Sequence, residues 1–551
     1  MRMSELMRPL GAIAMAALVM AACNDDKDGE EPQPQPDPPT PLVFGAPGSM
    51  TAESGRGSFA FGAATAATQI EDDNIHTDWH RWSQRVEDGG LGQGNEFVGD
   101  AVGSFSNPEM DLALIEELGL DDYRFSVEWG RIEPVRGEYD EEALAHYDAF
   151  IDRLVEMGVR PSITIHHFSN PVWVTAPGED CPEEGPTDEN LCGWDSEHGT
   201  DAIIESIGAF AGLLAERYGD RVDSWVTFNE PVNYIVAAYG AGYFPPGRSY
   251  VIDSIGKEAD DPIFQRLVGV FRSMLHAHVA IYDAIKANDV VDADGDGENS
   301  AIGLTLNSVD WQPAHRNRWS DAPNDVAAAD RMHYFYHFLL VDSLLNGNFD
   351  TDLDMVPDEE WPAWEGKIDW LGLQYYFRGG VTSSVTLIPG LKLFFCFEPF
   401  DFGACVRENR TKWIPTMAYE WFEEGIYNVL MRLAERYESL PVVITESGLA
   451  TNNEVRRSEH IVRTLEQIKR AMDDGADVRG YYHWSLTDNF EWHLGYGPHF
   501  GLYRVDRADN MRRTATHGAI TYREIIAERT LTTEHRELYG GTGDMSPETD
   551  E

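Results

Sequence analysis

Short apolar runs alternate with longer amphipathic stretches along most of the chain, from about Phe59 onward. Apolar runs of about 4–8 residues rich in β-branched and aromatic side chains are typical of buried strands. This alternation predicts a parallel sheet covered by helices. We count eight predicted strands: Phe59–Thr65, Asp122–Val127, Arg160–His166, Ser224–Phe228, Ala301–Asn307, Ile368–Tyr375, Val442–Thr445 and Gly480–Trp484.

The amphipathic stretches predict helices between these strands, at Pro108–Leu118, Glu141–Met157, Ile203–Tyr218, Phe264–Ala287, Ala327–Leu345, Glu420–Tyr437 and Glu459–Asp474. Eight strand–helix units are the number that closes a barrel, and barrels with insertions reach the length of this chain, 551 residues. The predicted fold class is therefore α/β, a single (β/α)8 TIM barrel with loop insertions at 56–530.

The first residues resemble an export signal. Two arginines precede an apolar run from Leu10 to Ala22, which is too short for a permanent membrane span. Because Met20-Ala21-Ala22-Cys23 resembles a bacterial lipoprotein box, we expect a signal peptide at 1–22 and a lipid on Cys23. Ordinary cleavage near the same site, without a lipid, stays open. Either interpretation exports the protein, anchored and facing the periplasm or cell exterior, or secreted.

Composition predicts two segments without regular secondary structure. Proline and charge at 23–55 predict a disordered tether, and the polar residues at 531–551 predict a frayed tail. The 95 acidic residues against 42 basic ones give a net charge of −53, which repels phosphate backbones and excludes nucleic acid as a partner. No membrane contact is expected beyond the N-terminal lipid, and the oligomeric state stays open.

Four further cysteines form two close pairs in polar segments of a chain bound for an oxidising compartment. We expect the disulfides Cys181–Cys192 and Cys396–Cys405. Zinc is the alternative, but no Cys-x-x-Cys spacing supports it.

Hydrogen-bonding side chains follow most of the predicted strands. In parallel barrels the strand ends meet at one face, so these residues predict a polar pocket with aromatic walls, suited to a sugar. Glu230 follows the fourth strand and Glu446 the seventh, on opposite sides of the barrel. Glycoside hydrolysis requires such a pair of carboxyl groups, one protonated and one ionised.

Four motifs now carry a resemblance to glycoside hydrolase family 1, the β-glucosidase family, from about Phe59 to Ala527. They are Thr-Phe-Asn-Glu-Pro around Glu230, Ile-Thr-Glu-Ser-Gly around Glu446, Tyr-Arg-Phe-Ser-Val-Glu-Trp-Gly-Arg-Ile-Glu-Pro at 123–134 and His-Trp-Ser-Leu-Thr-Asp-Asn-Phe-Glu-Trp at 483–492. The chain departs from the family pattern at Gln374 and Ser447, where asparagine is usual.

The resemblance implies a role for each residue. Glu230 would be the acid/base, with a raised pKa, and Glu446 the nucleophile, with a lowered one. Arg124 and Tyr376 would hold the nucleophile, and Asn229 would donate to the sugar 2-hydroxyl. The implied sugar-binding residues are Gln69, His167, Trp484, Glu491 and Trp492.

The predicted function is a retaining β-glycosidase of β-glucosidase type, which hydrolyses terminal β-linked glucosyl or galactosyl residues of a small carbohydrate without a cofactor or metal. Two alternatives stay open: a transglycosylase on the same scaffold and a non-catalytic sugar-binding lipoprotein. The spacing of Asp292, Asp294 and Asp296 before Gly297 matches the opening of a calcium loop, but its twelfth position is Gly303 rather than glutamate. An Asp/Gly turn and a structural calcium therefore both stay open.

Overall fold

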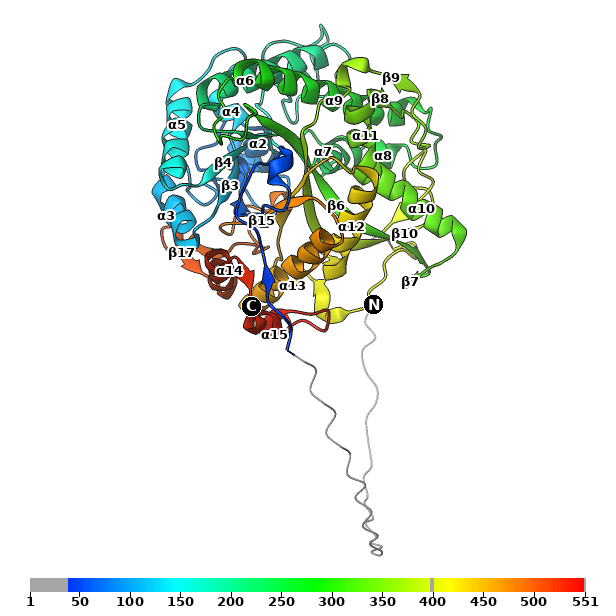
Figure 1. The fold of residues 1–551 in the computed structure, drawn as a ribbon. Helices are drawn as coiled ribbons and strands as arrows, with labels where there is room; N and C mark the ends of the chain where they lie inside the picture. The colour runs from blue at the N-terminus through cyan, green and yellow to red at the C-terminus, as the bar shows by residue number, and fades with distance from the viewer. Residues whose placement is uncertain (1–37, 397–400, 550–551) are drawn as a thin grey trace, which may run out of the picture. The chain divides into compact units, whose positions relative to one another are not determined.

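Eight parallel strands close into a barrel in the computed structural model, which describes residues 38–396 and 401–549 (Figure 1). Their spatial order follows the sequence, and the pairing of the last strand with the first completes the ring. The strands are β2 (Ala60–Ala64), β3 (Asp122–Ser126), β4 (Arg160–His166), β5 (Ser224–Asn229), β6 (Ala301–His315), β10 (Trp370–Thr382), β14 (Val442–Ser447) and β15 (Val478–Trp484). The predicted (β/α)8 barrel is confirmed.

Helices surround the barrel (Figure 1). The longer ones are α3 (Pro108–Leu118), α5 (Glu141–Glu156), α6 (Thr200–Tyr218), α9 (Pro262–Asn288), α10 (Pro323–His333), α11 (Leu339–Asn346), α12 (Glu423–Arg436), α13 (Glu454–Asp473) and α14 (His517–Glu528). The predicted helix Ala327–Leu345 is divided, because a π-helical turn (Tyr334–Phe338) separates α10 from α11. Short helices connect these elements: α1 (Ala67–Ile70), α2 (Asp78–Ser83), α4 (Trp129–Ile132), α7 (Pro231–Ile235) and α8 (Tyr250–Asp253). Within the described ranges, no helix combines the length and the apolar character that a bilayer span needs.

Burial on both faces explains why the barrel strands are readable in the sequence. Every residue of β5, β14 and β15 is buried, since helices cover the outside and side chains fill the inside. Parallel strands in such sheets are near-continuous apolar runs. The few polar residues within these runs are therefore the exceptional positions of the fold.

Two barrel strands run further than predicted. β6 and β10 pass the expected ends at Asn307 and Tyr375 because their pairing, interrupted between Tyr375 and Arg378, resumes and continues to Val381 opposite Pro313. Four short strands extend this projection: β7 (Arg318–Trp319), β11 (Phe394–Phe395), β12 (Trp413–Ile414) and β13 (Tyr419–Glu420). We call the projecting parts of β6 and β10, together with these four strands, the rim sheet.

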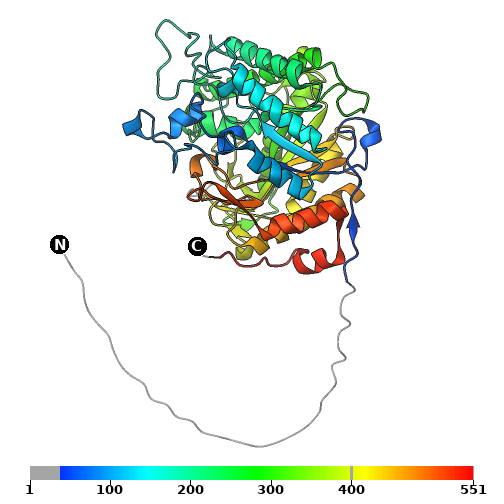
Figure 2. The same cartoon turned by 90° about the vertical axis from the view of Figure 1, so that its left-hand side faces the viewer.

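Both predicted low-structure segments need correction. β1 (Leu42–Val43) pairs antiparallel with β18 (Thr530–Leu531), so the barrel unit begins near Pro39 rather than at 56 (Figure 2). After β18 the chain forms α15 (Thr533–Tyr539) instead of fraying. Beyond α15, Arg463 donates to the carbonyls of Gly543 and Asp544, and Met545 is buried. These contacts hold a segment whose composition alone indicates disorder. The signal peptide, Cys23 and the first part of the tether lie outside the described residues.

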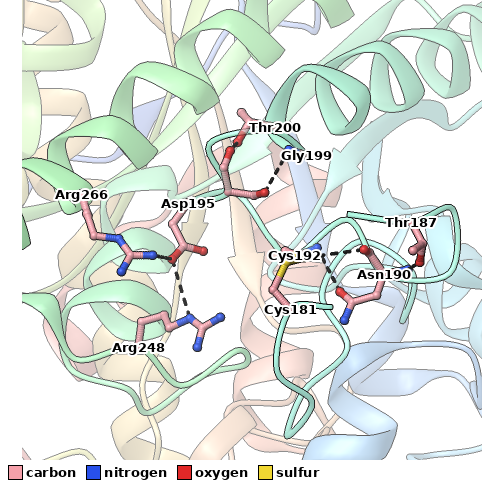
Figure 3. Close-up of a disulfide and its surroundings, with 10 residues drawn as sticks. Cys181, Thr187, Asn190, Cys192, Asp195, Gly199, Thr200, Arg248 and Arg266 are labelled. Carbon is pink, nitrogen blue, oxygen red and sulfur yellow. Dashed lines mark hydrogen bonds and ion pairs between the residues drawn. A yellow bond between two sulfur atoms is a disulfide. The ribbon is translucent and has the colours of Figure 1, made fainter. Parts of the chain in front are cut away.

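Both expected disulfides are present. Cys181–Cys192 closes a loop between β4 and α6, where the Asn190 side chain accepts a hydrogen bond from the Cys192 backbone N–H (Figure 3). Cys396–Cys405 closes a loop next to the rim sheet. The cysteines of each pair are bonded to one another, so the zinc alternative is not supported.

Candidate active site

Two carboxyl groups, of Glu230 and Glu446, line one cavity of about 200 Å³. Glu446 lies near the end of β14, and Glu230 directly follows β5 at the start of α7. Both residues are buried: 6% of the surface of Glu230 and 3% of that of Glu446 is exposed. The backbone of Glu230 has φ 42°, in the left-handed region that non-glycine residues seldom adopt. Backbone strain of this kind clusters at functional sites.

Arg124 and Tyr376 hold the carboxylate of Glu446 from two sides. Arg124 Nη1 donates to Oε1 at 2.6 Å, and the Tyr376 hydroxyl donates to Oε2 at 2.7 Å. The Arg124 guanidinium is fully buried. Tyr376 lies within β10, at the irregularity before the rim sheet, rather than at a strand end. A charge-assisted bond and a phenol donor at one carboxylate favour its ionised form.

The two carboxyl groups differ in acidity. Burial, followed by the charge of Glu446, raises the pKa of Glu230 well above its usual value. Burial also raises the pKa of Glu446, although Arg124 and Tyr376 lower it. The expected lowering of the Glu446 pKa is therefore wrong, because burial outweighs its partners. Arg124 donates to Glu446 and not to Glu230, which favours the charge on Glu446 and the proton on Glu230, the expected order of the pair.

The orientation of Asn229 is fixed by three donors to its side-chain oxygen. They are Arg124 Nη2 at 2.7 Å, Gln374 Nε2 at 2.7 Å and Thr305 Oγ1 at 3.1 Å. The amide nitrogen of Asn229 is thereby left as the group that can donate into the cavity. Gln374, a departure from the family pattern, thus bonds directly to a predicted site residue. Ser447, the other departure, donates to the Tyr375 carbonyl and lies outside the cavity lining.

Asn233 was missed by the sequence reasoning. It lies one turn after Glu230 on α7, and its Nδ2 donates to Glu230 Oε2 at 2.8 Å. Its Oδ1 accepts from the Tyr336 hydroxyl at 3.3 Å. The i, i+3 spacing from Glu230 was the available signal, because residues at that spacing share one helix face. Tyr336 had no such signal, since it comes from the π-helical turn between α10 and α11.

Four of the five predicted sugar-binding residues line the same cavity: His167, Trp484, Glu491 and Trp492. The His167 ring stacks against both indoles, each at 5.9 Å between centroids. Burial, with the charge of Arg124, holds the pKa of His167 well below its usual value, so the imidazole is neutral. Burial and the charge of Glu446 raise the pKa of Glu491 to about 8.

Gln69 lies behind this group rather than in the cavity lining. Its Nε2 donates to the Phe490 carbonyl at 2.7 Å, while its Oε1 is buried without a partner in the described structure. A hydrogen bond from Gln69 also lowers the pKa of Glu491. The predicted residues are thus gathered at one place.

The acidic loop before β6 lies at the opposite end of the barrel, where the strands begin. The Asp292 carboxylate accepts backbone N–H groups of Gly295, Asp296 and Gly297, which makes it the acceptor of an Asp/Gly turn. Carboxylate oxygens of Asp294 and Asp296 lie within 4.8 Å of one from Asp223. No residue of this group lines the cavity of Glu230 and Glu446.

Comparison with known sequences and structures places this geometry among glycosidases. The glycosyl hydrolase family 1 profile matches residues 52–531. The chain is 28% identical over 524 residues to a β-galactosidase of Pyrococcus woesei, covering 86% of this chain and 97% of that protein. It is 27% identical over 458 residues to β-glucosidase 25 of Oryza sativa subsp. japonica, covering 78% and 85%.

Solved structures agree in fold. A β-glycosidase from Pyrococcus horikoshii superposes with a TM-score of 0.69 at 27% identity, over 90% of this chain and 98% of that one. A family 1 β-glucosidase from Thermotoga maritima gives a TM-score of 0.70 at 24% identity, over 88% and 99%, which bears on the fold alone.

Proposed function

Because the chain belongs to glycosyl hydrolase family 1 and is an O-glycosyl hydrolase, we propose that it removes terminal β-linked glucosyl or galactosyl residues with retention of configuration. The observation that supports this most is the convergence of Glu230 and Glu446 on one cavity, with Glu446 held by a buried cation. Neither Lys nor Arg is among the described residues that line this cavity, so it offers no cation to a phosphorylated sugar. The reaction itself needs no cofactor.

In the first step the Glu446 carboxylate attacks the anomeric carbon while Glu230 protonates the leaving oxygen. The C–O bond to the aglycone breaks, and a covalent glycosyl ester forms on Glu446. In the second step Glu230, now ionised, takes a proton from water, whose oxygen attacks the anomeric carbon and releases Glu446. The raised pKa of Glu230 suits this cycle, because the group must be protonated at first and ionised after the ester forms.

The remaining residues would bind the sugar. Asn229 Nδ2 would donate to the 2-hydroxyl, in a contact that strengthens as positive charge develops on the ring. His167 and Glu491 would take the other hydroxyls, and the Glu491 oxygen without a partner is a free group for that purpose. Gln69, behind them, would support Glu491 through its hydrogen bond. Trp484 and Trp492 supply the apolar faces against which a sugar ring packs.

A panel of aryl β-glycosides tests the proposal. We expect hydrolysis of the gluco and galacto substrates, with the β-anomer as the first product in time-resolved NMR. Release of the α-anomer first would overturn retention. Transfer products that outnumber hydrolysis products at low acceptor concentration would favour a transglycosylase. Sugar binding without turnover on the whole panel would favour the non-catalytic alternative.

Replacing Tyr376 by phenylalanine is expected to lower kcat/KM about 10–100-fold near neutral pH, because a hydrogen bond to a charged group is lost. The hydroxyl lowers the pKa of Glu446, so its removal raises that pKa. Glu446 must be ionised, and activity is lost as pH falls through its pKa. The acidic limb of the kcat/KM profile should therefore move to higher pH. Tyr427→Phe, on the exposed face of α12, is the control. An unmoved acidic limb in Tyr376→Phe would contradict this role.

We also propose, from the N-terminal sequence, that the protein is exported and anchored through a lipid on Cys23. The two disulfides support an oxidising location. Cys23→Ser should move the protein from the membrane to the soluble fraction. A parent protein found wholly in the soluble fraction would contradict the anchor and leave secretion.

A further inference from the structure

A second, larger cavity adjoins the one that holds Glu230 and Glu446. Its volume is about 540 Å³, and we call it the outer chamber. The two cavities share part of their walls, including Asn233, Phe377 and Tyr419. Asn233 is also the residue bonded to Glu230, so the outer chamber opens on the side of the acid. The leaving group departs from the acid's side of the sugar, which places the aglycone in this chamber.

The lining of the outer chamber is strongly apolar. Charged residues make up 25% of the chain, yet no Asp, Glu, Lys or Arg of the described residues lines this space. Both polar atoms of the Asn233 amide are already used, by Glu230 and by the Tyr336 hydroxyl. Among the described residues that line it, four have a buried polar atom without a partner: Asn307 Oδ1, Tyr419 Oη, Trp311 Nε1 and His493 Nδ1. Asn307 and Tyr419 both lie on the shared wall, so they also line the cavity of Glu230 and Glu446.

A second sugar would fit this lining badly. A hexose carries several hydroxyls, and each one buried without a hydrogen bond costs about 1–3 kcal/mol. An apolar ring leaves no such group unsatisfied and gains from burial. The chamber volume falls in the range of about 300–1,000 Å³ that holds drug-sized apolar ligands.

The rim sheet builds the aromatic wall of the chamber. Trp311 comes from the projection of β6, Phe377 from that of β10, Phe395 from β11 and Tyr419 from β13. Phe377 stacks on Tyr419 with 4.7 Å between centroids, and Trp311 meets Phe395 edge-on at 5.6 Å. The Cys396–Cys405 disulfide immediately follows Phe395. Aromatic rings fixed by strand pairing and a disulfide form a preorganised surface rather than one assembled on binding.

We propose that the outer chamber selects an apolar, aromatic aglycone, so that the preferred substrates are β-glycosides of aryl-alkyl alcohols rather than disaccharides. This inference rests on the proposed glycosidase function and adds its leaving-group specificity. Leu387 and Phe395 line only the outer chamber and are assigned as specificity-determining residues.

Substrates with matched leaving groups test the inference. 2-Phenylethyl β-D-glucoside and ethyl β-D-glucoside both release a primary alcohol and differ in the phenyl ring. We expect kcat/KM for the phenylethyl substrate to exceed that for the ethyl substrate by about 10–100-fold. It should also exceed the value for cellobiose. A phenylethyl-to-ethyl ratio near one, or a preference for cellobiose with intact turnover, would overturn the inference while leaving the glycosidase function standing.

Variants assign the effect to the chamber. Leu387→Gln and Phe395→Gln should bring the phenylethyl-to-ethyl ratio close to one while the ethyl substrate is still hydrolysed. Phe402→Gln is the matched control, because Phe402 lies in the same disulfide loop, is 48% exposed and does not line the chamber. An unchanged ratio in both chamber variants would overturn the assignment.

A binding measurement distinguishes failure of the aglycone inference from failure of the glycosidase function. Calorimetry with 2-phenylethyl and ethyl 1-thio-β-D-glucosides, which resist hydrolysis, reports on the chamber without turnover. Tighter binding of the phenylethyl compound supports the chamber even if the glycosidase function fails. Equal binding of the two compounds overturns the inference whether or not any substrate is cleaved.

Discussion

Replacing Glu446 by glutamine is expected to lower kcat by at least about 10⁴-fold on every β-glycoside that the parent enzyme cleaves. The amide has nearly the shape of the carboxylate, but its oxygen carries no charge with which to attack the anomeric carbon. Arg124 Nη1 can still donate to that oxygen, so the variant should fold and bind sugar weakly. Steady-state kinetics on an aryl glycoside, with glucose binding by calorimetry, measures both parts.

A trapping experiment makes the same prediction specific to this residue. A 2-deoxy-2-fluoroglucosyl fluoride slows both steps through its 2-fluorine, while its good leaving group still allows the first step. The glycosyl ester should therefore accumulate on the peptide that contains Glu446, and none should form in Glu446→Gln. Glu424→Gln, on the outer helix α12, makes the same chemical change outside the site and should leave kcat unchanged. A label on another residue, or turnover retained in Glu446→Gln, would contradict the assignment.

The barrel could be predicted from sequence because its strands are buried on both faces and therefore stand out as apolar runs. Polar residues that follow or interrupt those runs, such as Arg124 and Glu446, could be recognised as candidate site residues for the same reason. The hydrogen bond between Arg124 and Glu446 could not be predicted from spacing, because the two residues are 322 positions apart and meet only when β3 and β14 join the same barrel. The motif resemblance supplied that pairing.

The rim sheet could not be predicted. The continuation of β6 from Ser308 contains Asp310, Gln312 and Pro313, a composition that favours a loop. It becomes a strand because β10 continues beside it and pairs with it. The local sequence pattern does not predict this pairing. The outer chamber depends on this sheet, so the leaving-group specificity was equally out of reach of the sequence.

The prediction that the C-terminal segment frays is wrong for a related reason. Its polar composition indicates disorder, but the groups that hold it belong to distant parts of the chain. Lys412 donates to the Thr542 carbonyl, and Glu548 accepts from the backbone of Asn452 and Asn453. The loop that these two asparagines occupy follows the strand of Glu446, so the tail holds a loop that leaves the same end of the barrel as the site.

Replacing Glu230 by alanine is expected to lower kcat about 10²–10⁴-fold on substrates with poor leaving groups, because the proton for the leaving oxygen is lost. Substrates with strongly acidic leaving groups should be affected much less in the first step, since they need no proton. The ester on Glu446 should then accumulate, because no base activates water. Pre-steady-state kinetics with a dinitrophenyl glucoside should show a burst of phenolate.

The space left by the side chain gives Glu230→Ala a distinctive chemical signature. Azide should enter that space and attack the ester without needing a base, which restores turnover and yields a β-glycosyl azide. Glu230→Gln fills the space and should show no such rescue, so it is the matched control at the same position. In the parent, kcat/KM should fall as pH rises through the raised pKa of Glu230, because the acid must keep its proton. That alkaline limb should be absent from Glu230→Ala. If the alkaline limb of the kcat/KM profile persists in Glu230→Ala, or if azide has no effect on that variant, another group protonates the leaving oxygen. Glu230 and Glu446 would then not be the catalytic pair.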